Sequence, residues 1–264
     1  MVHFRRIAVA QTCPVPGDVH VNTEEHVRLA RLAAAEGARL VVFPELSVTG
    51  YELELAERLA FTEDDARLNP LRDAASVYDA TLIVGAPVRL DSSLYIGAFI
   101  LQPDGRTQLY TKQRLGAFPP DARCDSVDGH VPPAEATVFQ QGDRNPLIAH
   151  NGHVAAVAIC ADIGRPAHAE EAAARGADLY LASMFVIPSD FPGEVEKLTR
   201  YATQYRMMTA LANFGCPSGS LRSAGRSSIW SEHGELLVQL AESGSGIAIV
   251  TDTDQGVVAK TFPG

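Results

Sequence analysis

Short apolar runs bounded by turn residues are the clearest pattern in this chain. Such runs predict strands that are covered on both faces. They lie at residues 7–11, 39–43, 81–84, 154–159 and 178–182. Hairpins are predicted where a glycine at the tip and apolar flanks suit a tight turn. Their tips are Asp104-Gly105, Asn151-Gly152 and His233-Gly234, and late strands are predicted at residues 228–230, 236–240 and 247–251.

Helical periodicity fills the intervals between these strands. One helix is predicted over residues 23–36, with Thr23 as its N-cap and Gly37 just beyond its end. A second helix is predicted over residues 166–175, ended by Gly176, and the remaining helical segments lie within residues 56–80 and at 198–211. Helices that alternate with strands and hairpins predict an α/β protein in which helices cover a mixed pair of sheets.

Two segments of the chain resemble each other. Residues 33–43 (AAAEGARLVVF) and 172–182 (AAARGADLYLA) each give a helix end, a glycine and a buried strand. One interpretation is that any α/β protein repeats this unit. The other is a chain of two similar halves folded face to face, and the repeat alone favours the first. Because no linker or low-complexity tract interrupts the sequence, residues 1–264 are predicted to form a single domain.

Composition excludes several classes of function. The chain has 264 residues, a formal net charge of -10 and no cluster of five or more Lys/Arg, which disfavours nucleic acid and anionic membranes as partners. No apolar run is long enough to span a membrane, and the first residues do not resemble a signal peptide, so a cytoplasmic location is expected. The four cysteines are widely spaced, which argues against a zinc ribbon or a disulfide scaffold.

Side chains capable of catalysis follow three of the predicted strands. Cys160 precedes a helix, whose N-terminus can stabilise a thiolate while the Ala161 N–H faces an oxyanion. Glu45 directly follows a buried strand, where burial can raise a carboxyl pKa enough to make it a general base. Lys112 ends a strand, where its charge can favour a thiolate. Taken singly, these residues are more simply a core cysteine, a loop glutamate and a surface lysine.

The order of these three residues along the chain resembles the Glu-Lys-Cys triad of the nitrilase superfamily, the carbon–nitrogen hydrolases. Five motifs carry the resemblance, which extends over about residues 5–250. They are FPELSVTGY at 43–51, YTKQRL at 110–115, EATVFQQGD at 135–143, ICAD at 159–162 and GRSSIWSEHGE at 225–235. The resemblance implies a four-layer α-β-β-α sandwich that assembles as a homodimer or a higher homo-oligomer.

The resemblance also implies a reaction. The protein is expected to be a cysteine hydrolase that cleaves a non-peptide C–N bond of a small amide or carbamoyl compound through a thioester. Cys160 would be the nucleophile and Glu45 the base, while Lys112 and the Ala161 N–H would hold the oxyanion. Glu135 would position the substrate or the attacking water.

The remaining expectations concern the pocket and its ligands. The resemblance places Tyr51, Met184 and Phe185 in the pocket walls. The sequence has neither an HExxH motif nor a phosphate loop, so no metal and no cofactor are predicted. His150 and His153 flank a hairpin turn and are interpreted as solvated rather than metal-binding.

The chain departs from the family pattern near the expected site, which leaves the substrate open. Arg114 stands where the family usually has histidine, and Gln204-Tyr205 stands where it has Glu-Asn. The segment at residues 163–168 (IGRPAH) is also unusual, and its Arg165 or His168 would either meet an anionic substrate group or cap the helix, with capping favoured. An amidase or carbamoylase, a nitrilase and a catalytically silent binding protein therefore remain alternatives.

Overall fold

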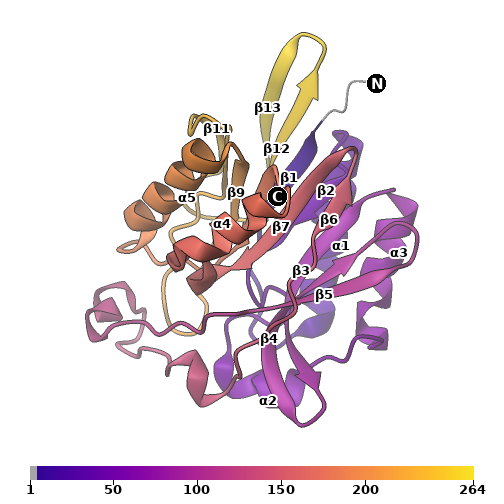
Figure 1. Ribbon diagram of the computed structural model, residues 1–264. Coiled ribbons are helices and arrows are strands. Elements are labelled where there is room, and N and C mark those ends of the chain that lie inside the picture. Colours follow the sequence, from indigo (N-terminus) through magenta and orange to yellow (C-terminus); the bar gives the residue numbers. More distant parts are fainter. Residues whose placement is uncertain (1–4) are drawn as a thin grey trace.

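The computed structural model describes residues 5–264, and these residues form two β-sheets with helices outside them (Figure 1). Within that range, one sheet has seven strands in the order β13-β12-β1-β2-β3-β4-β5. These strands are β1 (Arg6–Gln11), β2 (Leu40–Val42), β3 (Thr81–Leu90), β4 (Ser93–Leu101), β5 (Thr107–Thr111), β12 (Gly246–Thr253) and β13 (Gly256–Pro263). The parallel strands β1, β2 and β3 form its centre.

The other sheet has six strands in the described part of the chain, in the order β11-β10-β9-β8-β7-β6. They are β6 (Ile148–His150), β7 (His153–Ile159), β8 (Leu179–Ser183), β9 (Met208–Ala212), β10 (Ser228–Trp230) and β11 (Leu236–Gln239). Here too, three parallel strands, β7, β8 and β9, lie next to each other. The two sheets therefore share the same central arrangement.

Helices cover the outer face of each sheet. The seven-stranded sheet packs against α1 (Val19–Ala35) and α3 (Asn69–Val77), and the six-stranded sheet against α4 (Pro166–Ala174) and α5 (Phe191–Tyr205). The remaining short helices are α2 (Ala56–Leu59), η1 (Leu53–Leu55), η2 (Ala66–Leu68), η3 (Pro120–Asp125), η4 (Glu135–Thr137) and η5 (Cys160–Gly164).

Alternation along the strands explains the layers. Ile7 and Val9 belong to the core shared by the two sheets, whereas Ala8 and Ala10 belong to the core beneath α1 and α3. Successive side chains of a strand point to opposite faces, so a strand that is apolar throughout is buried on both sides. The predicted four-layer α-β-β-α sandwich is thereby confirmed.

The internal resemblance corresponds to two matching units. α1 leads through Gly37 to β2, and α4 leads through Gly176 to β8. The units belong to different sheets and meet across the central core, where the Ser183 hydroxyl donates to the Phe43 carbonyl at 2.8 Å. The chain is therefore better described as two similar halves folded face to face. The generic repeat, which the sequence alone favoured, is the poorer description.

Two predicted helices have the wrong bounds. The first begins at Val19 rather than after Thr23, because the Asp18 carboxylate accepts from the Val21 N–H and caps the helix earlier. The helix predicted over residues 198–211 is α5, which ends at Tyr205, where the next residue, Arg206, has a left-handed φ of 55°. The apolar run that follows is β9, a strand paired on both sides. β13 is an addition that the pattern did not predict.

Outside the predicted site, two further expectations can be compared with the structure. The histidines flank a hairpin as expected, but His150 is buried rather than solvated, and His153 contacts Asp178 at 2.5 Å. No helix among residues 5–264 is both long and apolar enough to cross a membrane.

Candidate active site

The ends of three strands bring the predicted catalytic residues together. Glu45 follows β2, Lys112 follows β5 and Cys160 follows β7. The Lys112 ammonium donates to Glu45 Oε1 at 2.6 Å and to Glu135 Oε1 at 2.7 Å. Lys112 and both carboxylates are at most 1% exposed, so this ion cluster lies in a low-dielectric interior where its Coulomb interactions are strong.

Neighbouring backbone and side chains fix this cluster in place. The Gly116 N–H donates to Glu135 Oε2 at 2.7 Å, and the Tyr51 hydroxyl donates to Glu135 Oε1 at 2.8 Å. The Gly142 N–H donates to the Lys112 carbonyl at 2.8 Å. A side chain at Gly142 would overlap Thr111, which explains why a glycine ends this motif.

The electrostatics of the cluster favour a base beside a protonated thiol. Burial, only partly offset by the Lys112 ammonium, raises the pKa of Glu45 to about 7. Burial acts to lower the pKa of Lys112, but the two carboxylates outweigh it and raise that pKa, so the amine stays charged. Burial, reinforced by Glu45, raises the pKa of the Cys160 thiol well above its ordinary value. These directions favour a Cys160 thiol whose proton is removed during attack by the neighbouring carboxylate, as the sequence analysis expected of Glu45.

Cys160 occupies a strained turn between β7 and η5. Its φ is +44°, a left-handed value that is uncommon outside glycine, and its thiol contacts the Phe185 carbonyl at 3.8 Å. Strain of this kind is typical of functional sites. Glu45 Oε2 is buried without a hydrogen-bond partner in the described residues, and the Glu45 carboxyl and the Cys160 thiol lie close enough for each to shift the pKa of the other. That oxygen is free to accept the thiol proton.

Asp162 supports this turn, a role that the sequence pattern did not identify. It is 1% exposed, and its carboxylate accepts from the Ile159 N–H at 3.0 Å on one side of Cys160. It also accepts from the Gln113 and Arg114 N–H groups at 3.1 and 2.7 Å. Asp162 thus ties the cysteine turn to the segment directly after Lys112. Its place two residues after the cysteine was the available sequence signal.

A buried chain of hydroxyl and imidazole groups extends from Asp162. The Tyr110 hydroxyl donates to Asp162 at 2.6 Å and accepts from His168 Nε2 at 2.9 Å, while His168 Nδ1 accepts from the Tyr180 hydroxyl at 2.8 Å. Burial lowers the pKa of His168, so its ring is neutral, as this donor order requires. His168 therefore neither meets the substrate nor caps the helix. The Arg165 side chain makes no capping hydrogen bond to α4 either. Its guanidinium lies 3.8 Å from the Glu171 carboxylate instead.

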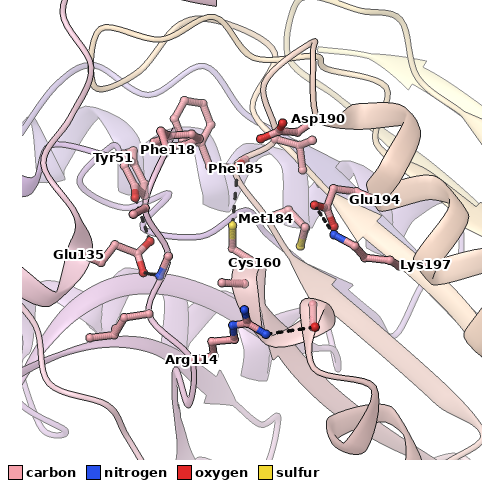
Figure 2. A pocket seen from close by; sticks show the side chains of 16 residues that line it. Tyr51, Arg114, Phe118, Glu135, Cys160, Met184, Phe185, Asp190, Glu194 and Lys197 are labelled. Atoms are coloured by element: carbon pink, nitrogen blue, oxygen red, sulfur yellow. Dashed lines mark hydrogen bonds and ion pairs between the residues drawn. The ribbon is translucent and has the colours of Figure 1, made fainter. Parts of the chain in front are cut away.

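A pocket of about 260 Å³ opens onto Cys160 (Figure 2). The predicted residues Tyr51, Ala161, Met184 and Phe185 line it, together with Glu135. Glu45 and Lys112 lie behind this surface. The other lining residues are Arg114, Leu115, Gly116, Ala117, Phe118, Gly164, Val186, Asp190, Glu194 and Lys197. One wall is aromatic, because the Tyr51 ring lies 4.9 Å from Phe185 and 5.8 Å from Phe118, measured between centroids.

Some of the unusual sequence positions meet at this pocket. The Arg114 guanidinium donates to the Gly164 carbonyl at 3.1 Å, which joins two segments that differ from the family pattern. In contrast, Gln204 and Tyr205 lie in the last turn of α5 and do not line the pocket, so this departure does not fall where the substrate is chosen. Asn213, which the sequence analysis missed, is fully buried and accepts from the Val186 N–H at 2.9 Å, supporting the wall beyond Phe185.

The fold and the motifs of this site define a carbon–nitrogen hydrolase. The sequence profile of the carbon-nitrogen hydrolase family matches residues 6–260, and the chain belongs to this family. It is similar to a protein named "Hydrolase in pqqF 5'region" from Pseudomonas protegens, with 28% identity over 258 residues, 96% of this chain and 83% of that protein.

Other relatives have different activities. The chain is 26% identical to the glutamine-dependent NAD(+) synthetase of Mycobacterium tuberculosis over 273 residues. The match covers 95% of this chain but only 39% of the synthetase. Among solved structures, a cysteine-to-alanine variant of the Nesterenkonia AN1 amidase, of the nitrilase superfamily, superposes with a TM-score of 0.79 at 25% identity. That similarity covers 95% of this chain and 91% of the amidase.

Proposed function

We propose that this protein hydrolyses a small amide or carbamoyl compound through a thioester on Cys160. The observation that carries the proposal is the buried cluster in which Lys112 binds both Glu45 and Glu135 beside the cysteine turn. A buried ion cluster of this kind is costly to place in a core and gives a fold little stability. Its position behind the only strained cysteine of the described chain supports a catalytic role.

The first step is attack by sulfur on the amide carbonyl. As the C–S bond forms, Glu45 Oε2 takes the thiol proton, which suits a carboxyl whose pKa is about 7. Glu45 then gives the proton to the leaving nitrogen as the C–N bond breaks. Ammonia or an amine departs, and the acyl group remains on Cys160 as a thioester. Glu45 next activates a water molecule, whose attack releases the acid and regenerates the thiol.

Lys112 and Ala161 stabilise the charge that develops on the substrate oxygen. Among the described residues, two of the three ammonium N–H groups of Lys112 bind carboxylates, which leaves the third for the oxyanion. The Ala161 N–H supplies the second donor at the start of η5. Glu135 orients the substrate amide or the water, because its own carboxylate is held from both sides by Gly116 and Tyr51.

Amide hydrolysis is preferred over nitrile hydrolysis on the basis of structural similarity. The Nesterenkonia amidase binds butyramide in one solved structure and is modified by fluoroacetamide at its active-site cysteine in another, each at 25% identity to this chain. A nitrilase of Pseudomonas syringae matches 54% of this chain at 28% identity, so a nitrile remains the second candidate substrate. The chain spans 39% of the length of the glutamine-dependent NAD(+) synthetase of Mycobacterium tuberculosis.

The far wall of the pocket indicates what else the substrate carries. Lys197 binds Glu194 Oε1 at 2.8 Å, but Glu194 Oε2 is buried without a hydrogen-bond partner among residues 5–264. Figure 2 shows this pair across the pocket from Glu135. An unsatisfied carboxylate oxygen favours a ligand that donates a hydrogen bond. The substrate is therefore expected to present an N–H or ammonium group there, while its apolar part lies against Tyr51 and Phe185.

The test is an ammonia-release screen over amides, carbamoyl amines and nitriles of matched carbon chain, each with and without a distal amino group. The expected result is amide turnover that the distal amine improves. Cys160→Ala should lower the rate by about 10⁴-fold or more. Acid formed from nitriles but not from amides would instead establish a nitrilase. If no substrate turns over and iodoacetamide labels Cys160 no faster than Cys124, the chain is a binding protein.

A further inference from the structure

A pair of thiols, Cys13 and Cys216, lies away from the proposed active site. Thr12, which follows β1, pairs with Phe214 in an isolated parallel bridge, and the Gly215 N–H donates to the Thr12 carbonyl at 2.8 Å. This pairing brings the segments of Cys13 and Cys216 together, and the two thiols are close enough for each to shift the pKa of the other. The Cys216 thiol also contacts the Pro217 carbonyl at 3.6 Å. Neither cysteine belongs to the pocket or to the cluster around Lys112.

The surroundings of Cys13 favour reaction. The neighbouring Cys216 thiol, opposed by burial and assisted by the Ser245 hydroxyl, lowers the pKa of Cys13 to about 7. Both cysteines are partly exposed, so a small oxidant can reach them. An accessible thiol with a lowered pKa and a second thiol beside it is the arrangement found in redox-active cysteine pairs.

We propose that Cys13 and Cys216 form a reversible disulfide by exchange with a low-molecular-weight disulfide such as glutathione disulfide. The Cys13 thiolate attacks one sulfur of glutathione disulfide, which forms a mixed disulfide and releases one glutathione thiolate. Cys216 then gives its proton to that thiolate and attacks Cys13 Sγ, which expels the second glutathione. Two protein thiols and one glutathione disulfide thus become one protein disulfide and two glutathione thiols.

The bond would connect parts of the molecule that are distant in sequence. Cys13 follows β1 of the seven-stranded sheet, and Cys216 follows β9 of the six-stranded sheet, so the disulfide would link the two sheets. It would also restrain the segment that supports the pocket, because the Ser218 hydroxyl accepts from the Tyr51 N–H at 2.8 Å. A cross-link that closes a loop through most of the chain stabilises the fold mainly by restricting the unfolded state.

The test uses the full-length chain with Cys124→Ser and Cys160→Ala, so that only this pair of thiols remains. After incubation with glutathione disulfide, the intact mass should fall by two hydrogen atoms, and peptide mapping should recover Cys13 joined to Cys216. The matched controls add Cys13→Ser or Cys216→Ser, and each should retain one glutathione adduct. If the two-thiol protein instead carries two glutathione adducts, or stays fully reduced while the controls react, the proposal is wrong.

A second measurement asks whether the native structure accommodates the bond. The oxidised two-thiol protein should migrate as a monomer on a non-reducing gel, because the bond is within one chain. Its melting temperature should be about 5 °C higher than that of the reduced form. Dithiothreitol should reverse the shift, and the single-thiol controls should show none. A bond that joins two chains, or one that leaves the melting temperature unchanged or lower, would overturn the inference. Neither measurement depends on turnover, so the result is independent of the proposed hydrolase activity.

Discussion

The two thiol sites of this protein achieve reactivity in opposite ways. Cys160 lies in the interior next to carboxylates, and burial together with Glu45 raises its pKa. Cys13 lies nearer the surface beside a second thiol, and its pKa is lowered to about 7. In the proposed mechanism the first sulfur becomes a nucleophile only when Glu45 removes its proton during attack, whereas the lowered pKa of the second favours its thiolate without a carboxylate base. A nucleophilic cysteine therefore cannot be recognised from its pKa alone.

The largest expected effect is the loss of turnover on substitution of Glu45, which should leave the Cys13 and Cys216 pair unaffected. Glu45→Gln should reduce kcat by about 10³-fold or more while KM changes little, because the base is lost and the substrate contacts remain. Steady-state kinetics would measure this, and Glu54→Gln, which changes an exposed side chain of η1, should be without effect. Oxidation of Cys13 and Cys216 should proceed at its normal rate in Glu45→Gln. A retained kcat would assign the base elsewhere.

Glu45 also fixes the expected pH dependence. Its pKa of about 7 means that it is protonated at lower pH and cannot accept the thiol proton. The value of kcat/KM should therefore be highest above pH 7 and fall as the pH drops through that value. Glu135→Gln, which changes a carboxylate that does not take the proton, should lower the rate and keep an acidic limb, moved to lower pH because the Glu135 charge helps to raise the pKa of Glu45. A flat profile between pH 6 and pH 8 would contradict the assignment.

An intermediate effect is expected at Asp162, which positions Cys160 without touching the substrate. Asp162→Asn keeps one acceptor for the Gln113 and Arg114 N–H groups but loses the acceptor for Tyr110 and Ile159. A misplaced nucleophile should lower kcat by about 10- to 100-fold with KM retained. Tyr110→Phe, which removes only one of these contacts, serves as the milder control. If both variants lose kcat and thermal stability to the same extent, Asp162 supports the fold and does not position Cys160.

The smallest effect concerns the thiol pair. In the Cys124→Ser, Cys160→Ala chain, iodoacetamide should label Cys13 with a rate that rises through pH 7 and then levels off. Removing the neighbouring thiol with Cys216→Ala should move that inflection upward and slow labelling at pH 7 by about 3-fold. The fold change is modest because a more basic thiolate is also a better nucleophile. An inflection that does not move would show that Cys216 has no influence on Cys13.

Much of the fold followed from local pattern, and the errors have a common physical cause. Apolar runs such as residues 154–159 became strands because both of their faces are covered. The apolar segment after Tyr205 was assigned to a helix, yet it pairs with β8 and β10 as β9. Periodicity cannot distinguish a short buried strand from a buried helical segment, and partners on both sides decide it. The early start of α1 came from a single side chain, Asp18, that competes with Thr23 for the cap.

The family, the layers and the order in which Glu45, Lys112 and Cys160 follow their strands could all be predicted from the amino-acid sequence. These depend on local motifs and on alternation along each strand, which the chain carries within a few residues. Only the tertiary structure decided what surrounds each group. Asp162 binds residues about fifty positions earlier, and Cys216 meets a cysteine near the start of the chain. Burial, neighbouring charge and the second thiol set the direction of the pKa shifts at Glu45, Cys160 and Cys13, and they arise only when distant segments pack together.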